Sequence, residues 1–229
     1  MDREKIEENA RRLQVEIWRS RDRLWCDRDI PPLSSMFTPE IAAQVLGIKY
    51  RVLPGLGSFG NGEARFEVAG FIDKQADGVF ISQQFSPIIQ RFTGAHEIGH
   101  WMLHKSQIIQ HRDRQIAGLT AGIPRPLLER EADYFAACYL IPRNVLRDSF
   151  ESRFGSIDCF RFNEDAAFGL GKRDARALMT SPPESLEWES ALSAAIRYHG
   201  SPYFQSLEGE FQVSNKTMAI RLSEVGLRG

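Results

Sequence analysis

The sequence predicts an α+β fold in which a small, mostly antiparallel sheet is followed by helices. Segments that resemble strands lie between residues 48 and 82, and segments with helical periodicity dominate the rest of the chain. Strands gathered early with helices after them favour an α+β layout over repeated βαβ units. The 229 residues, 42% of them hydrophobic and 26% charged, suffice for a globular core of ordinary size.

The helices before the sheet are indicated by apolar periodicity and by capping residues. Over residues 2–25, apolar side chains recur at roughly helical spacing between charged ones, namely Ile6, Ala10, Leu13, Ile17 and Leu24. A shorter helix is expected after the break at residues 29–35. There, Thr38 is a candidate N-cap, Pro39 suits the first helical position and Gly47 ends the helix.

The strands are indicated by alternating apolar and polar residues between turn residues. Such segments cover residues 48–54, 64–73 and 78–82, with a glycine-rich loop after the first of them. The second and third segments are joined near Asp77 and Gly78, a dipeptide typical of tight turns. This arrangement predicts a small sheet with mostly antiparallel neighbours.

The helices after the sheet suggest two parts of the chain. Long helices are expected over residues 86–105 and from about residue 126 to the proline at 142. The following segment is harder to interpret, and we place a soft boundary there. The prediction is a domain of residues 1–150 and a C-terminal helical region of residues 151–229, with three short helices towards its end.

Composition and cysteine usage narrow the class of protein. The formal net charge of −1 does not indicate a dedicated nucleic-acid coat protein. Cys26, Cys138 and Cys159 are odd in number, widely spaced and without a CxxC pair, which argues against a disulfide framework and a thiolate zinc site. The N-terminus has no apolar signal-peptide core, and no apolar run is long enough to cross a bilayer. We therefore expect a cytoplasmic protein with reduced thiols.

The stretch "TGAHEIGHWMLH" carries the pattern H-E-x-x-H. On a helix, His96 and His100 lie four residues apart on one face, so both can reach one metal ion. Glu97 is displaced by about 100° around the helix axis. From there it can reach a water molecule at the metal without ligating the metal itself. This is the geometry of a zinc peptidase helix.

The alternative interpretation of this stretch is a pair of surface histidines on an amphipathic helix. Gly94 and Gly99 argue against it, because each lowers intrinsic helix stability by about 1 kcal/mol relative to alanine. Such glycines are better explained by a close neighbour. The helix is also apolar over much of its girth, so we expect it to be buried, and buried histidines need partners.

Zinc needs a third protein ligand and an open position for water. The helix expected after residue 126 offers Glu129 and Glu131. Glu129 shares a face with Asp133 and several small residues, and an acidic pair in a packed stripe is costly unless a cation faces it. Glu131 lies on another side and is expected to be solvated. For Glu129, a solvated acidic first turn favoured by the helix dipole is the alternative.

Together these two segments resemble a known family. "HEIGHWMLH" followed by "EREADYFAACYLIP" resembles the ImmA/IrrE family of zinc metallopeptidases, which shows H-E-h-G-H-h-h-h-H and then E-x-E-A-N-x-F-A-x-x-L-L-M-P, with h apolar. The resemblance covers about residues 78–142, and the ending "FQVSNKTMAIRLSEVGL" is similar to the family's usual C-terminus. Asp133 stands where the family usually has Asn. Aspartate there is similar to the thermolysin-like zincins, in which it would hold a ligand histidine.

The resemblance implies a zincin-like metallopeptidase core with the HExxH helix, followed by the all-helical C-terminal region. It implies a cytoplasmic endopeptidase that holds Zn²⁺ through His96, His100 and Glu129 and uses Glu97 as its catalytic base. Known members cleave a helix-turn-helix repressor and so derepress stress, mobile-element or anti-phage genes. Because some are activated by DNA-damage signals, a nucleic acid is a candidate activator. No membrane partner is expected.

Further roles follow from the requirements of peptide hydrolysis. Asp133 would orient a ligand histidine through its second ring N–H, and a substrate strand could add to an exposed sheet edge near residues 78–82. His104 lies about 6 Å further along the helix axis than His100, a poor position for a third ligand. We interpret it as a packed or capping histidine. Cys138 is expected in the core, with a removable fourth ligand as its alternative. The candidates for oxyanion stabilisation are Tyr139, His111, Tyr198 and His199.

Two rival functions stay open. The C-terminal segment "FQVSNKTMAIRLSEVGL" also has the pattern of a helix, a short turn and a second helix, with Ser214 as the N-cap and Gly226 ending the second helix. The protein could therefore be a DNA-binding regulator with a non-cutting zinc domain, and Lys216 and Arg221 are the candidate base-reading residues. The second rival is a pseudo-peptidase that binds zinc or a partner without cutting. The intact Glu97 argues against it.

Overall fold

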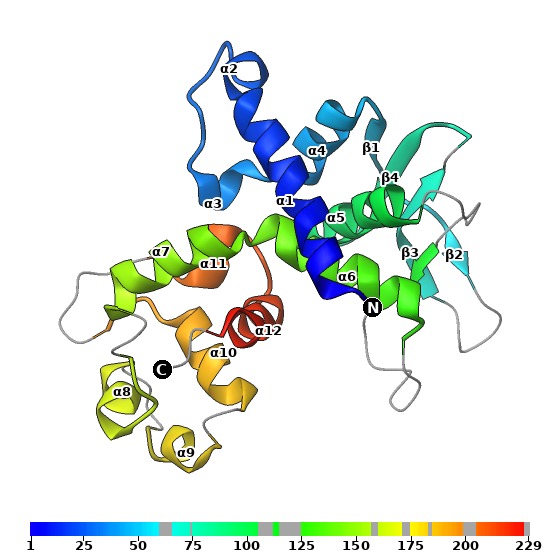
Figure 1. Cartoon of the computed structure of the whole chain (residues 1–229). Coiled ribbons are helices and arrows are strands. Elements are labelled where there is room, and N and C mark those ends of the chain that lie inside the picture. Colours follow the sequence, from blue (N-terminus) through cyan, green and yellow to red (C-terminus); the bar gives the residue numbers. More distant parts are fainter. Residues whose placement is uncertain are drawn as a thin grey trace. The chain divides into compact units, whose positions relative to one another are not determined.

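The structure, a computed structural model, divides into two compact units (Figure 1). The first unit comprises Met1–Pro32 and Met36–Leu140, and the second comprises Leu33–Ser35 and Ile141–Gly229. The residues that the structure describes are 1–59, 66–73, 75–104, 112–114, 125–156, 160–170, 175–182, 185–198 and 205–226.

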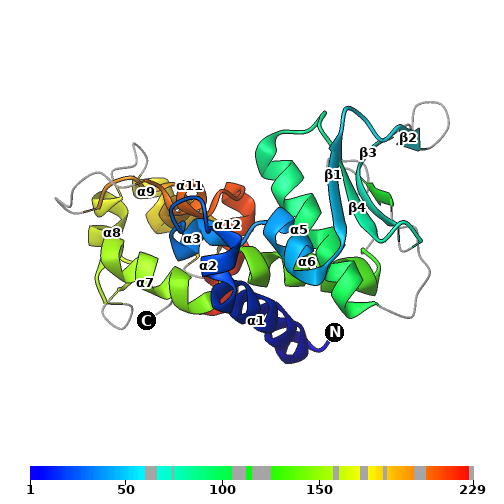
Figure 2. The same cartoon turned by 90° about the horizontal axis from the view of Figure 1, so that it is seen from above.

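The first unit contains the sheet. Its strands are β1 (Lys49–Leu53), β2 (Ser58–Phe59), β3 (Phe66–Asp73), β4 (Gly78–Ser82) and β5 (Arg112–Arg114). The order along the sheet is β1-β4-β3-β2, and β5 also pairs with β3. The β1–β4 pair is parallel and the other pairs are antiparallel. The sheet is therefore mostly antiparallel, as the sequence predicted (Figure 2).

The position of β4 contradicts one expectation. This strand pairs with β1 along its whole length and with β3 on its other side, so it offers no edge to a substrate strand. Four of its five residues are buried, which is typical of a strand with neighbours on both sides. Among the described strands, β1 and β2 stand at the two ends of the order. The short apolar run at residues 78–82 carries no information on which strands flank it.

Three long helices position the site in the first unit. They are α1 (Arg3–Arg19), α5 (Pro87–Leu103) and α6 (Leu127–Leu140). Helix α5 packs against β3 and β4, α6 packs on α5, and α1 packs on α6 (Figures 1 and 2). Gln14 joins α1 to α6, because its side-chain amide donates to the backbone carbonyls of Cys138 and Tyr139, both at 2.9 Å.

The N-terminal helices follow the predicted periodicity with one difference. All five predicted apolar positions are buried, namely Ile6, Ala10, Leu13, Ile17 and Leu24. The single expected helix is broken at Ser20, however, and continues as the one-turn helix α2 (Arg21–Leu24). The next helix in this unit is α4 (Pro39–Leu46). Its caps are the predicted ones, since the Thr38 hydroxyl accepts from the Ile41 amide and Gly47 adopts φ +70°.

In the second unit, every element that the structure describes is a helix. Helix α3 (Leu33–Met36) spans the division between the units. The others are α7 (Arg143–Phe154), α8 (Glu164–Gly169), α9 (Ala175–Thr180), α10 (Leu186–Ala194), α11 (Leu207–Phe211) and α12 (Asn215–Val225). Helix α10 packs against both α11 and α12. The predicted start and end of the last helix are confirmed. The Ser214 hydroxyl accepts from the Thr217 amide, and Gly226 ends α12 with φ +67°.

Candidate metal centre

Two glycines of α5 let other elements approach this helix closely, Gly94 on the side of β1 and α4 and Gly99 on the side of α6. A methyl group added at Gly94 would lie 2.5 Å from the Tyr50 hydroxyl and 2.8 Å from Pro39 Cβ. At Gly99, a methyl group would lie 3.1 Å from a Phe135 ring carbon and 3.2 Å from the Ala132 backbone. The predicted reason for glycine inside this helix is therefore confirmed, because each glycine permits a close neighbour. Close approach of α6 at Gly99 brings its acidic first turns beside the histidines of α5.

The three predicted ligand residues converge at this contact. His96 and His100 are each 1% exposed, and their Nε2 atoms lie 3.0 Å apart. Glu129 Oε2 lies 3.3 Å from His96 Nε2, and Glu129 Oε1 lies 3.5 Å from His100 Nε2. One ligand atom from each of the three residues falls within 4.8 Å of the others. Two imidazole nitrogens and a carboxylate so placed could hold a metal ion.

The Glu129 carboxylate is adapted to this environment. Burial by itself raises the pKa of the carboxyl group, but hydrogen bonds from His100 and His96 more than offset this effect. The resulting pKa lies far below the ordinary value for glutamate. Glu129 is therefore anionic at neutral pH, which a metal ligand must be. The alternative of a solvated first-turn carboxylate is wrong, since the side chain is only 16% exposed.

Asp133 holds the second ring nitrogen of one histidine, as predicted. His96 Nδ1 lies 2.9 Å from Asp133 Oδ1, which leaves Nε2 directed at Glu129. Arg125 contacts the other Asp133 oxygen and lies 3.7 Å from Glu129 Oε2. Sequence reasoning missed Arg125. Its spacing of four residues before Glu129 was a signal, because oppositely charged residues at this spacing face each other on a helix.

Glu97 is enclosed beside the cluster. It follows His96 on α5 and is 0% exposed. A fully buried glutamate within a helix is uncommon, because carboxylates are seldom buried without partners. The structure thus shows Glu97 buried directly after His96 on α5, and its role as the catalytic base stays a prediction.

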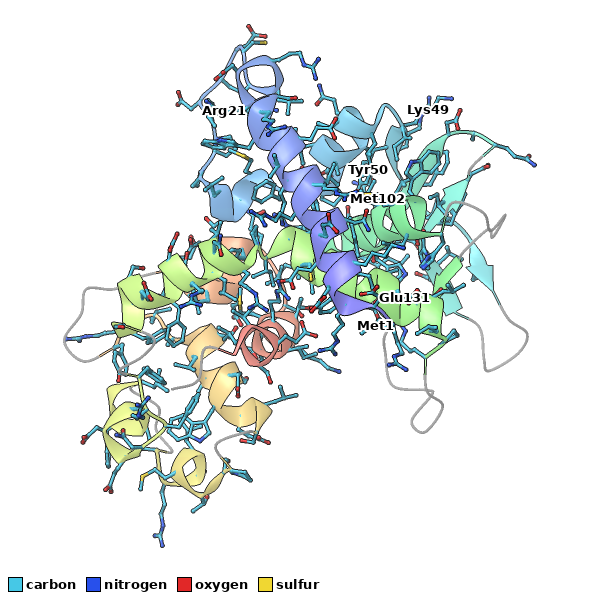
Figure 3. The ribbon with its side chains drawn as sticks, viewed as in Figure 1. Met1, Arg21, Lys49, Tyr50, Met102 and Glu131 are labelled. Carbon is cyan, nitrogen blue, oxygen red and sulfur yellow. The ribbon has the colours of Figure 1, made fainter. Side chains whose placement is uncertain are left out.

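His104 and Glu131 depart from the predicted picture. His104 follows α5 as its C-cap, and its amide donates to the His100 carbonyl at 3.1 Å, in agreement with a capping histidine. Its ring Nε2 lies 3.2 Å from Glu131 Oε2. Glu131 also lies 4.0 Å from the Met1 amine and is 19% exposed (Figure 3). The expectation that Glu131 is solvated is therefore wrong, because the end of α5 and the start of the chain cover it.

Of the four candidates for oxyanion stabilisation, the structure describes Tyr139 and Tyr198. Tyr139 is 0% exposed, and its hydroxyl donates to the Thr38 carbonyl at 2.8 Å, so it belongs to the core of the first unit. Tyr198 packs against Phe154 and Phe160 in the second unit, where burial raises the pKa of its hydroxyl. His111, His199 and Cys159 lie outside the described residues.

The remaining sequence predictions concern Cys138 and membrane contact. Cys138 is 2% exposed in α6, as expected for a core cysteine. Within the described part of the chain, no helix combines the length and the hydropathy needed to cross a membrane.

Comparison with known proteins finds a family match but no individual relative. A search of curated proteins finds no match. The sequence model of the IrrE N-terminal-like domain, a peptidase family designated M78, matches residues 56–168. This segment includes His96, Glu97, His100 and Glu129, the residues of the predicted site. The match supports the resemblance to the ImmA/IrrE family that the sequence indicated and, at the family level, a metallopeptidase-type protein.

Proposed function

We propose that this protein is a cytoplasmic zinc-dependent endopeptidase that cleaves a helix-turn-helix transcriptional repressor. The observation that carries the proposal is the convergence of His96, His100 and Glu129 within 4.8 Å in a chain of a peptidase family. The substrate class is supported by the resemblance to ImmA/IrrE peptidases, whose known members cleave such repressors. Cleavage would derepress stress, mobile-element or anti-phage genes.

The donor set fits zinc. Zinc takes two imidazoles and a carboxylate at about 2.0–2.2 Å, so ligand atoms around a tetrahedral ion stand about 3.3 Å from one another. The separations here are 3.0 Å between the two Nε2 atoms and 3.3 and 3.5 Å from these atoms to Glu129. Three protein ligands would leave one position of the tetrahedron open, as in catalytic zinc sites.

In the proposed mechanism, Glu97 would transfer the proton and Asp133 would orient a ligand histidine. When bound, zinc would supply Lewis acidity, which lowers the pKa of water toward about 7. A Glu97 carboxylate oxygen would accept a proton from the attacking water and then pass it to the amine of the leaving peptide. Asp133 would hold His96 with its proton on Nδ1, so that the Nε2 lone pair faces the cluster.

The proposal is tested by separating metal binding from cleavage. Glu97→Gln keeps the three ligands and the side-chain volume, so the variant should bind zinc like the wild type. It should lose cleavage of a co-expressed helix-turn-helix repressor by about 10²- to 10⁴-fold, because the proton acceptor is lost. Zinc would be measured by atomic emission and cleavage by immunoblot of the repressor. Cleavage at the wild-type rate would remove Glu97 from the mechanism, and a wild-type protein without zinc would refute the proposal.

Activation by a nucleic acid is part of the same proposal, since some members of the resembled family respond to DNA damage. Adding single-stranded or duplex DNA to purified enzyme and repressor should raise the cleavage rate. An unchanged rate with both would remove nucleic acid as the activator.

The rival DNA-binding function loses one of its two candidate residues. Arg221 is 1% exposed, and its Nε donates to the Ile141 carbonyl at 3.2 Å within the second unit. A guanidinium committed in this way cannot reach base edges. Lys216 is exposed, but a single lysine supplies phosphate attraction and little sequence readout.

A further inference from the structure

His104 and Glu131 form a hydrogen-bonded chain of side chains that begins at the second ligand histidine, His100. His100 Nδ1 lies 2.9 Å from His104 Nδ1, and His104 Nε2 lies 3.2 Å from Glu131 Oε2. All three residues are shielded, because the two histidine rings are buried and Glu131 is only 19% exposed. The chain runs from the candidate metal centre to the end of α5 and across to α6.

The positions of the ring protons of His100 and His104 follow from the fact that His100 Nε2 faces the candidate metal centre. His100 Nε2 faces His96 Nε2 and Glu129, so a bound metal would take its lone pair and the ring proton must reside on Nδ1. His100 Nδ1 then donates to His104 Nδ1, which must carry a lone pair. The His104 proton therefore resides on Nε2 and points at a carboxylate oxygen of Glu131. One set of tautomers satisfies every atom of the chain.

We infer that His104 and Glu131 are positioning residues that fix the tautomer and orientation of the His100 ligand. The inference rests on the proposed zinc function. Each ligand histidine would then be oriented by a carboxylate. His96 donates directly to Asp133, whereas His100 donates to His104, which in turn donates to Glu131. A carboxylate at the end of such a chain raises the basicity of the ligand. His104 thus contributes to the metal centre without touching the metal.

Zinc affinity distinguishes this role from simple packing. His104→Leu keeps an apolar side chain of similar size but removes the acceptor, so zinc affinity should fall about 10- to 100-fold. His104→Asn places an amide oxygen near the former Nδ1 position, where it can accept from His100, so affinity should recover most of the loss. Glu131→Ala should weaken zinc binding and Glu131→Gln should restore part of it. The control is Arg130→Ala, which removes an exposed neighbour on the same helix and should change nothing.

Affinities would be measured on the full-length chain by competition with a chromophoric chelator, with circular dichroism to compare folding. Two-bond ¹H–¹⁵N spectra of the histidine rings in the zinc-loaded wild type supply a readout that needs no variant. His104 should show its proton on Nε2 and His100 on Nδ1.

The outcomes separate this inference from the proposed function. The positioning role of His104 and Glu131 would be overturned if His104→Leu bound zinc with wild-type affinity, or if the His104 proton lay on Nδ1 in the zinc-loaded protein. Either result would leave the peptidase proposal intact. Equal losses in His104→Leu and His104→Asn would reduce His104 to a packing residue. A wild-type chain that binds no zinc would overturn both proposals.

Discussion

His96 and Asp133 are joined by a hydrogen bond of 2.9 Å between Nδ1 and Oδ1, across the contact of α5 with α6. The other nitrogen of the same ring lies 3.3 Å from Glu129, one helical turn before Asp133. Two carboxylates four residues apart on α6 therefore lie at the two nitrogens of one imidazole. The small residues at the helix contact allow this arrangement, because they let the backbones approach closely.

Asp133→Ala should weaken zinc binding about 10- to 100-fold, because His96 would lose the group that fixes its tautomer. Asp133→Asn is the matched control, since the amide oxygen can still accept from Nδ1 and asparagine is the usual residue in the resembled family. Competition with a chromophoric chelator would give both affinities. Undiminished affinity in Asp133→Ala would exclude the orienting role.

Glu129→Ala should lose zinc on dialysis against a weak chelator, because it removes a ligand. Glu131→Ala should retain more metal than Glu129→Ala, since Glu131 acts only through His104. Metal content after dialysis, measured for both variants beside the wild type, decides between them. The reverse order, with zinc kept by Glu129→Ala and lost by Glu131→Ala, would show that the wrong face of α6 was assigned to the metal.

Gly94→Ala should destabilise the protein by about 1–3 kcal/mol, because the added methyl group overpacks the contact with Tyr50 and Pro39. Helix propensity alone predicts the opposite sign, a gain of about 1 kcal/mol. Urea unfolding of the metal-free protein measures the difference. The double variant Gly94→Ala/Tyr50→Phe removes the nearest hydroxyl and should be less destabilised relative to Tyr50→Phe alone. A more stable Gly94→Ala protein would show that no close contact exists there.

Arg221→Ala should destabilise the protein by about 1.5–3 kcal/mol, because the buried Ile141 carbonyl loses its charged hydrogen-bond donor. Lys216→Ala, on the exposed side of the same helix, should leave stability unchanged. Urea unfolding and an electrophoretic DNA-binding assay would be run on both variants. A stable Arg221→Ala protein with selective loss of DNA binding would reinstate the DNA-reading function.

The sequence alone determined the local features of the site. Helical periodicity is a property of the chain itself, so it placed His96 and His100 on one face and separated Glu129 from Glu131 on the next helix. Capping residues located the ends of α4 and α12 for the same reason, since each cap satisfies backbone groups of its own helix. The two glycines of α5 indicated a close neighbour but could not name it.

The tertiary structure decided which of these local features meet. The partners of Glu131 and Arg125 depend on how α6 crosses α5 and how the start of the chain lies beside them, and no periodicity encodes that crossing. The two neighbours of β4 depend on hydrogen bonds to strands distant in sequence. Arg221 was a candidate base-reading residue in the rival hypothesis, because a charged residue on a short helix is usually solvated. It is buried because the backbone carbonyl of Ile141, 80 residues away, accepts from its guanidinium. Contacts between residues so far apart in sequence depend on the folded backbone, so local sequence patterns cannot predict them.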